Sequence, residues 1–300
     1  MTNPIICIGH AALDRIYRIE AFPPKPTKVR ALEHIESGGG MAANAAATIA
    51  TLGGAVELWS RVGADDAGSK IKAGLKRAGV DTRYIETFDE GRSSTSAILV
   101  DHEGERLIVG ARDINMPSGT SWLPLERVAQ APLVVADMRW LEGVRAVFER
   151  ARASSTPTVL DAELGGREAM GEVLALTDFA IFSEPALEEL LPGLDMQARL
   201  DRVLLMGPRH AGVTLGARGY MWRDQFGGGS VPGFTVEVTD TTGAGDAFHG
   251  AFALMLAEGH AIGECARFAC AVAAMKCTRL GSRTGLPRRP DVDRFLSERG

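Results

Sequence analysis

The chain has 300 residues, of which 45% are hydrophobic and 24% charged, the proportions of an ordinary globular protein. Its formal charge of −5 excludes the strongly basic surface of a nucleic-acid-binding protein, and no segment reaches the roughly 20 consecutive apolar residues of a membrane span. The N-terminus enters a strand pattern at once, without the basic and then apolar stretch of a secretory signal. We therefore expect a cytoplasmic protein that binds neither nucleic acid nor membrane.

The cysteine spacing and the distribution of basic residues bear on possible metal and anion sites. The four cysteines have no C-x-x-C spacing, and three of them lie in an apolar run at helical intervals, so we expect buried reduced thiols and no zinc site. Basic residues are dispersed, apart from a short cluster near the C-terminus that we interpret as a solvated tail or part of an anion site. Its members are Arg279, Arg283, Arg288 and Arg289.

Short apolar runs alternate with helical patterns along most of the chain. Strands are expected at 5–9, 56–59, 133–137, 158–161, 179–183 and 212–216, and helices at 42–53, 68–79, 142–153, 168–176, 185–191 and 246–258. This alternation predicts an α/β fold, a doubly wound and mostly parallel sheet with helices on both faces. We expect residues 1–300 to form one domain, in which the glycine run at 227–230 is a surface turn.

Two segments, residues 16–37 and 92–112, interrupt this alternation. Both have extended patterns with no helix between their strands, and D-H-E-G at 101–104 is the expected turn of an antiparallel hairpin. Strands that leave a parallel sheet in pairs predict a small β-sheet lid over one edge of the domain. Because free sheet edges tend to be covered, we expect a homodimer that pairs through this lid.

A glycine-rich turn precedes the helix expected at 246–258, in V-E-V-T-D-T-T-G-A-G-D-A-F. The backbone N–H groups of Gly243, Ala244 and Gly245 at a helix N-terminus form an anion site. Asp246 would repel a static phosphate, so it is useful there only beside a hydroxyl group that attacks the phosphate. It would accept the hydroxyl proton while the N–H groups stabilise the transferring phosphoryl group. The alternative is that Asp246 only caps the helix.

Two earlier segments suggest a small polar ligand. S-G-G-G-M-A-A-N at 37–44 lets the backbone approach a polyhydroxy compound, with Asn44 supplying an amide, and Asp14 follows the first strand, where doubly wound sheets bind ligands. The glycine segment also fits G-x-G-x-x-A, but that dinucleotide fingerprint belongs to the first strand–helix turn of its domain. The alternatives are close backbone packing for the glycines and a solvated loop for Asp14.

Together these residues resemble the PfkB (ribokinase-like) family of carbohydrate kinases over nearly the whole chain. The resemblance is carried by D-T-T-G-A-G-D-A-F at 240–248, G-G-x-x-A-N at 39–44, T-L-G-A-R-G at 214–219 and Asp14. It implies an ATP-dependent sugar kinase whose catalytic base is Asp246 and whose anion hole is the turn from Thr242 to Gly245. It further implies that Asp14, Gly39, Gly40 and Asn44 hold the sugar, and that the nucleotide site includes Thr214, Gly216, Thr242 and Gly245.

The resemblance also implies metal ions. Many members organise Mg²⁺ with an N-x-x-E motif, but this chain has S-E-P-A-L at 183–187, which leaves Glu184 as the candidate residue. Members often bind a monovalent cation such as K⁺ near the anion hole. The matching positions are Asp240, Thr242, Arg279 and Gly281, of which Asp240 and Gly281 are the candidate ligands.

Within the family the chain is most similar to bacterial sulfofructose kinases. The shared stretches are L-D-R-I-Y (13–17), A-D-M-R-W (136–140), F-S-E-P-A-L (182–187) and K-C-T-R-L-G-S-R-T-G-L-P (276–287). The resemblance implies that Lys28 and Arg139 hold a sulfonate. An asparagine expected on the lid is replaced by Gly110, and Arg112 is placed to compensate.

The implied reaction is phosphorylation of a primary hydroxyl of a ketose, 6-deoxy-6-sulfofructose to its 1-phosphate, with Mg-ATP as donor. Other interpretations stay open at this point: another anionic ketose, a neutral sugar such as fructose or ribose, a nucleoside as acceptor, or a sugar sensor without catalysis.

Overall fold

The computed structural model describes residues 3–163 and 167–299, in which a nine-stranded sheet forms the centre of the molecule. Its strands lie in the order β13-β12-β11-β10-β9-β8-β1-β4-β5. The parallel members are β1 (Ile5–Ile8), β4 (Val56–Gly63), β5 (Ile85–Phe88), β8 (Val134–Asp137), β9 (Thr158–Ala162), β10 (Phe179–Ser183) and β11 (His210–Thr214). Two antiparallel strands, β12 (Tyr220–Asp224) and β13 (Gly227–Val231), complete one edge.

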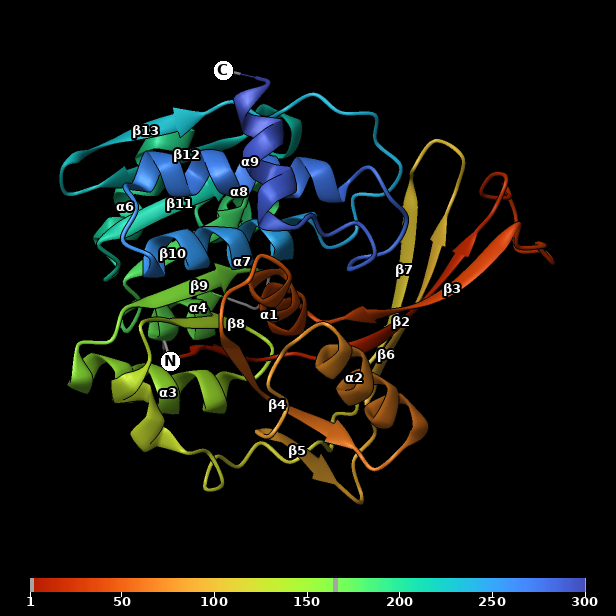
Figure 1. Ribbon diagram of the computed structural model, residues 1–300, viewed down its shortest axis with the longest axis horizontal. Helices are drawn as coiled ribbons and strands as arrows, with labels where there is room; N and C mark the ends of the chain where they lie inside the picture. The colour runs from red at the N-terminus through yellow and green to blue at the C-terminus, as the bar shows by residue number, and fades with distance from the viewer. Residues whose placement is uncertain (1–2, 164–166, 300) are drawn as a thin grey trace.

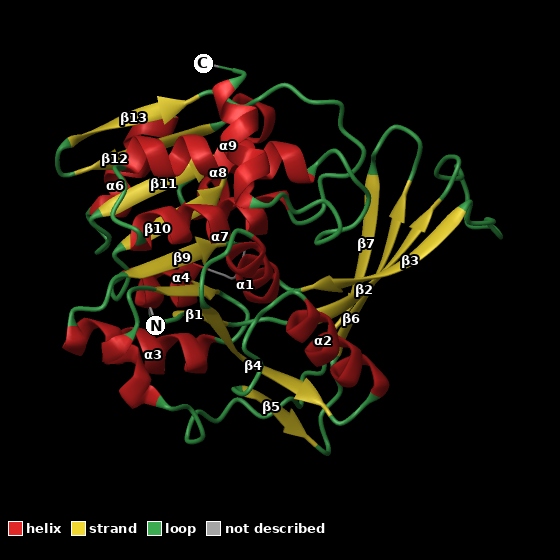
Figure 2. Ribbon diagram, viewed as in Figure 1, coloured by secondary structure: helices red, strands yellow, loops and turns green. Residues whose placement is uncertain are grey.

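Helices cover both faces of this sheet (Figure 2). One face packs against α1 (Met41–Thr51), α2 (Asp66–Arg77), α7 (Ala244–Ala257), α8 (Ile262–Lys276) and α9 (Arg289–Ser297). The other packs against α3 (Leu141–Ser154), α4 (Arg167–Leu174), α5 (Glu184–Leu190), α6 (Met196–Leu204) and the 3₁₀ helix η1 (Leu125–Gln130). Because strand side chains alternate between faces, Ile5 and Cys7 enter one core and Ile6 and Ile8 the other. This is the doubly wound α/β fold that the sequence predicts.

A second, four-stranded sheet projects from one side of the molecule as a separate blade (Figure 1). It has the order β3-β2-β6-β7, built from β2 (Ala12–Arg18), β3 (Glu33–Gly39), β6 (Ser94–Val100) and β7 (Arg106–Ala111). The predicted hairpin is present as the antiparallel pair β6–β7, and β2 runs parallel to β6. We call this sheet the lid.

The parallel strands end at a topological switch point. From β1 the chain first adds β4 on one side and later returns to add β8 on the other. The residues that follow β1 and β8 therefore face a crevice at the carboxyl ends of the strands, where open α/β sheets bind ligands. The lid strand β2 begins a few residues after β1, so the lid starts at this crevice.

Most predicted elements lie within two residues of the observed ones, although β4 continues to Gly63. The prediction of a surface turn at 227–230 is wrong, because these residues belong to β13 and pair with β12. A Cβ atom on Gly229 would lie 2.4 Å from the Trp222 ring, so the glycine allows that ring to cross the neighbouring strand. No helix in the described part of the chain is long and apolar enough to cross a bilayer.

Candidate active site

The glycine-rich turn lies at the N-terminus of α7, as the sequence predicts. Gly243 is the N-cap residue, with φ 76°, and a Cβ atom there would lie 2.9 Å from Cβ of Ser282. Glycine is therefore required both by the left-handed backbone and by the close approach of the neighbouring loop. In residues 3–163 and 167–299, no oxygen accepts the N–H groups of Gly243 and Gly245. These donors are available to a bound anion.

Asp246 lies in the first turn of α7 and accepts a hydrogen bond from Nδ2 of Asn44 at 2.7 Å. Burial, and then the nearby carboxyl group of Asp161, raise its pKa to about 7, while Asn44 and His249 oppose this shift. A carboxylate with a pKa near the working pH is suited to accept a proton and release it again.

The side chain of Arg283 extends from the loop after α8 to Asn44, the partner of Asp246. Its Nε donates to Oδ1 of Asn44 at 2.7 Å, and its Nη2 donates to the Gly39 carbonyl at 3.0 Å. Burial lowers the pKa of Arg283 to about 10. Of the two predicted alternatives for the basic cluster, a solvated tail is therefore wrong for this residue, whereas part of an anion site stays a prediction.

Asp14 lies within the lid strand β2, so the alternative of a solvated loop aspartate is wrong. Its side chain is buried and accepts a short hydrogen bond from Ser96 of β6. Burial raises its pKa, whereas Ser96 and the charge of Arg283 lower it. A Cβ atom on Gly39 would collide with the Asp14 carboxylate, so this glycine lets the backbone of β3 approach it.

The predicted sugar-binding residues therefore gather around Arg283. Gly40 is the N-cap residue of α1, with φ 90°, and starts the helix that carries Asn44. Asp14 and Asn44 face the same arginine from the lid and from α1, and Asn44 connects it to Asp246.

The predicted nucleotide residues line a pocket of about 350 Å³ on the other side of the anion turn. Thr214, Gly216 and Gly245 belong to its wall, next to the 3₁₀ helix η2 (Gly216–Arg218). The remaining wall is largely apolar, as the flat face of a nucleotide base requires, and the volume is within the usual range for small-molecule sites. Thr242 does not line this pocket; it is buried, and its hydroxyl accepts from Arg106 of the lid at 3.4 Å.

A second pocket, of about 220 Å³, opens at the switch point beside the lid. Four arginines line it: Arg61, Arg92, Arg112 and Arg139. We call it the arginine pocket. Its lining comes from the residues after β1, from β4, from the start of β6, from the segment after β7 and from the loop after β8. Only Arg112 and Arg139 of the four were predicted site residues. Lys28 is outside this lining and exposed, in the loop between β2 and β3.

The arginine pocket is lined by four arginines and a single carboxylate, Asp113. In the described part of the chain, none of its four guanidinium groups forms an ion pair with a carboxylate. Arg61 lies over the Trp140 ring, 4.3 Å from its centroid, and donates to the Pro117 carbonyl at 2.7 Å. The carboxylate of Asp113 is in the lining, but it accepts the backbone N–H of Arg92 at 2.8 Å.

His10, just after β1, lines the same pocket, and Asp137 at the end of β8 lies behind it. Nε2 of His10 is buried without a partner in the described residues. Asp137 accepts the backbone N–H groups of His10 at 2.7 Å, Ala42 at 3.0 Å and Arg139 at 2.8 Å, so one carboxylate fixes the start of three segments. Neither residue is among the predicted site residues.

The metal candidates lie outside these pockets. Glu184 is the first residue of α5 and forms an ion pair with Arg218, and no cluster of His, Cys, Asp or Glu in the described residues could hold a metal ion. At the second candidate site, both carboxylate oxygens of Asp240 accept backbone N–H groups, from Thr242 and from Gly281, each at 2.8 Å. The ammonium group of Lys276 lies 3.9 Å from Oδ2 of Asp240, so this surrounding does not fit a free cation.

Comparison with known proteins identifies the family of this chain. Residues 2–289 match the model of the pfkB family carbohydrate kinases. The chain is 30% identical to a ribokinase of Bacillus subtilis over 98% of its length and 99% of the relative's, and 29% identical to an ATP-dependent ribose-1-phosphate kinase of Halopiger xanaduensis over 98% of both. The crystal structure of a putative ribokinase from Agrobacterium tumefaciens has a TM-score of 0.95 at 32% identity, covering 99% of this chain and 98% of that one. The structure of Arabidopsis thaliana ribokinase complexed with ribose and ATP has a TM-score of 0.87 at 26% identity and covers 99% of each chain.

The fold and the site thus define a carbohydrate kinase of the ribokinase-like class. The chain belongs to the pfkB family and is an ATP-dependent phosphotransferase that acts on a sugar.

Proposed function

We propose that this kinase phosphorylates a primary hydroxyl of a ketose that carries a second, anionic group. The first candidate is 6-deoxy-6-sulfofructose, with its 1-phosphate as product. The observation that supports the proposal is the arginine pocket, in which four unpaired guanidinium groups converge beside the sugar site. Guanidinium groups repel one another, and they bind tetrahedral anions with paired N–H donors, so the pocket is suited to a sulfonate or phosphate.

The proposed chemistry uses the residues around Asn44. Asp14 accepts hydrogen bonds from the sugar hydroxyls, and the reacting hydroxyl faces Asp246. The carboxylate of Asp246 takes the hydroxyl proton while the oxygen bonds to the γ-phosphorus of ATP and the bond to the bridging oxygen of ADP breaks. The N–H groups of Gly243 and Gly245 stabilise the charge on the transferring group. The proton then leaves Asp246 for solvent.

ATP is proposed to lie in the 350 Å³ pocket, with Thr214 and Gly216 at its base end and its phosphates at the turn that includes Thr242 and Gly245. Mg²⁺ neutralises phosphate charge and keeps several waters, so it can enter with ATP without a protein cage. Glu184 stays the candidate for organising those waters, for which its ion pair with Arg218 must open.

A related kinase shows that the family includes an enzyme whose name describes a charged sugar, the ribose-1-phosphate kinase of Halopiger xanaduensis. The arginine pocket favours a charged sugar here as well. Arg139 and Arg112 keep their predicted role, and Arg61 and Arg92 join them. Lys28 is proposed to contact the anion only when the loop between β2 and β3 folds over the bound sugar.

The test is a coupled assay of ADP release with Mg-ATP against 6-sulfofructose, fructose 6-phosphate, fructose, ribose and adenosine. The proposal expects kcat/KM for an anionic ketose to exceed that for fructose by at least about tenfold, the effect of one charge-assisted hydrogen bond. A preference for fructose or ribose would be consistent with the proposed kinase mechanism but would refute the proposal that the substrate carries an anionic group. Preference for adenosine would favour a nucleoside kinase, and no turnover at all would favour a sugar sensor.

We also propose that two chains pair through the lid. β7 is an edge strand in which three consecutive apolar side chains, Leu107, Ile108 and Val109, are each more than half exposed. A second lid would cover them and the free strand edge. Sedimentation should show a dimer that Ile108→Glu converts to a monomer, whereas Phe226→Glu, at an exposed phenylalanine between β12 and β13, should leave it intact. A monomeric wild type would refute the pairing.

A further inference from the structure

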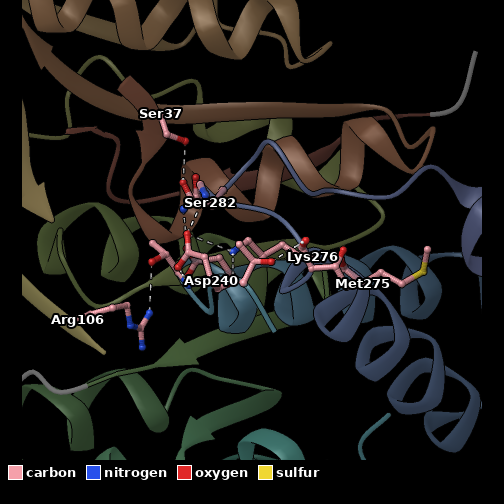
Figure 3. Close-up of polar contacts among 12 residues, drawn as sticks. Ser37, Arg106, Asp240, Met275, Lys276 and Ser282 are labelled. Atoms are coloured by element: carbon pink, nitrogen blue, oxygen red, sulfur yellow. Dashed lines mark hydrogen bonds and ion pairs between the residues drawn. The ribbon is translucent and has the colours of Figure 1, made fainter. Parts of the chain in front are cut away.

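Lys276 is the last residue of α8, and it is fully buried beneath the anion turn. Its Nζ donates to the backbone carbonyl of Asp240 at 2.8 Å and lies 3.9 Å from the carboxylate oxygen Oδ2 of the same residue. Figure 3 shows the two side chains next to each other, with Ser282 close by. An ammonium group in such a place requires negative partners, because burying an unpaired charge is costly.

Asp240 connects the anion turn to the loop after α8. One carboxylate oxygen accepts the N–H of Thr242, which begins the turn, and the other accepts the N–H of Gly281 in the loop. Ser282, the next residue, packs against Gly243 and donates to the Gly38 carbonyl. The carboxylate thus holds together the anion turn, the loop that carries Arg283 and, through Ser282, the glycine segment of the sugar site.

We propose that the Lys276 ammonium group is a built-in monovalent cation, which holds Asp240 and the anion turn in place so that the enzyme needs no dissolved K⁺. An ammonium group and K⁺ have the same charge and both are satisfied by oxygen atoms. A free cation at Asp240 would lie within a few ångströms of Lys276, and the guanidinium of Arg106, bonded to Thr242, adds further positive charge. Lys276 lines neither of the two pockets, so we treat it as a positioning residue.

The first test uses the wild-type protein. It is dialysed into choline chloride, given the Tris salt of ATP with MgCl₂ and the sugar that the substrate panel identifies, and assayed with added KCl, NH₄Cl, NaCl or more choline chloride at equal ionic strength. We expect kcat to stay within about twofold in all four salts. A saturable rise of tenfold or more with K⁺ or NH₄⁺ would overturn the proposal.

A second measurement needs no substrate, so it tests the role of Lys276 even if the kinase phosphorylates none of the sugars in the panel. The melting temperature should be equal in KCl and in choline chloride of the same ionic strength, because the site already contains its cation. A saturable increase in melting temperature that is specific to K⁺ would contradict the proposal on its own.

The variant Lys276→Met keeps the length of the side chain and removes its charge. We expect its kcat to fall at least tenfold in choline chloride and to recover, with saturation, on addition of K⁺ or NH₄⁺, and its melting temperature to become K⁺-dependent. Lys76→Met, at an exposed lysine on α2, is the matched control and should behave as the wild type. A folded Lys276→Met protein that keeps full activity in choline chloride, or that no cation restores, would overturn the proposal. If this variant does not fold, the two wild-type measurements still decide.

Discussion

The amide of Asn44 donates a hydrogen bond to the carboxylate of Asp246, with 2.7 Å between Nδ2 and Oδ2. The carbonyl oxygen of the same amide accepts from Arg283 at 2.7 Å, which fixes the orientation of the amide group. Asn44 therefore donates to the proposed base, Asp246, and supports its ionised form. The pH range in which Asp246 can act depends on this bond.

Removal of the base is the most direct test of the mechanism. Asp246→Asn keeps the shape of the side chain and can still accept from Asn44, but it cannot take the hydroxyl proton. We expect kcat to fall by roughly 10² to 10⁴, the range for general bases, with little change in the KM of the sugar. Steady-state kinetics measure both values, and near-normal turnover in the variant would exclude Asp246 as the base.

The activity should rise with pH across the neutral range. Asp246 acts only when ionised and its pKa is about 7, so a plot of kcat/KM against pH should bend near pH 7 and fall at lower pH. The bond from Asn44 lowers this pKa, so Asn44→Ala should move the bend to higher pH. A bend that stays in place in the variant would show that another group controls it.

The same carboxyl group should reduce stability at high pH. Its pKa in the folded protein, about 7, lies above the ordinary value of 3.8, so the folded state binds the proton more tightly and loses stability as pH rises through this window. Asp246→Asn removes this cost. Thermal melts should show the variant more stable than the wild type at pH 8 and nearly equal to it at pH 4. A gain that is independent of pH would contradict the raised pKa.

Arg283 should support the site through position as well as charge. Arg283→Met removes the bonds to Asn44 and Gly39 and the positive charge near Asp14, so we expect kcat/KM for the sugar to fall by roughly 10 to 100-fold, mainly through KM. Arg283→Lys, which keeps the charge, should recover part of the loss. An unchanged KM for the sugar would refute this role.

The arginine pocket can be tested by changing one exposed member. Arg112→Gln should reduce kcat/KM for the anionic ketose by roughly 10-fold or more and that for fructose by less than about threefold, because only the charged group meets the guanidinium. Arg202→Gln, at an exposed arginine of α6, is the control. An equal decrease in kcat/KM for both sugars would show that Arg112 does not bind the anionic group of the substrate.

The features that could be predicted from the sequence are those that short segments determine by themselves. The buried parallel strands appear as apolar runs, and the anion turn has its glycines, its helix start and Asp246 within a few residues. The lid hairpin has its turn and two alternating strands.

The arginine pocket could not be predicted in the same way. Its guanidinium groups come from four segments far apart in the chain, and only the switch point and the lid bring them together. The role of Lys276 could not be predicted either. A lysine at the end of an apolar helix is expected to be exposed, and its partner Asp240 lies on a distant segment. The glycines of β13 were misinterpreted because the Trp222 ring that they accommodate belongs to the neighbouring strand.

The proposed sugar ligand Asp14 and the proposed base Asp246 come from different parts of the fold. Asp14 belongs to the lid, whereas Asp246 belongs to a helix that covers the large sheet, and Arg106 of the lid also bonds to Thr242 at the start of the anion turn. A water molecule could occupy the place of the reacting hydroxyl, but it could not connect the lid to the large sheet as a sugar can. If Asp14 holds the sugar and Asp246 takes its proton, as proposed, only a bound sugar contacts both residues, and we expect hydrolysis of ATP without sugar to be slow.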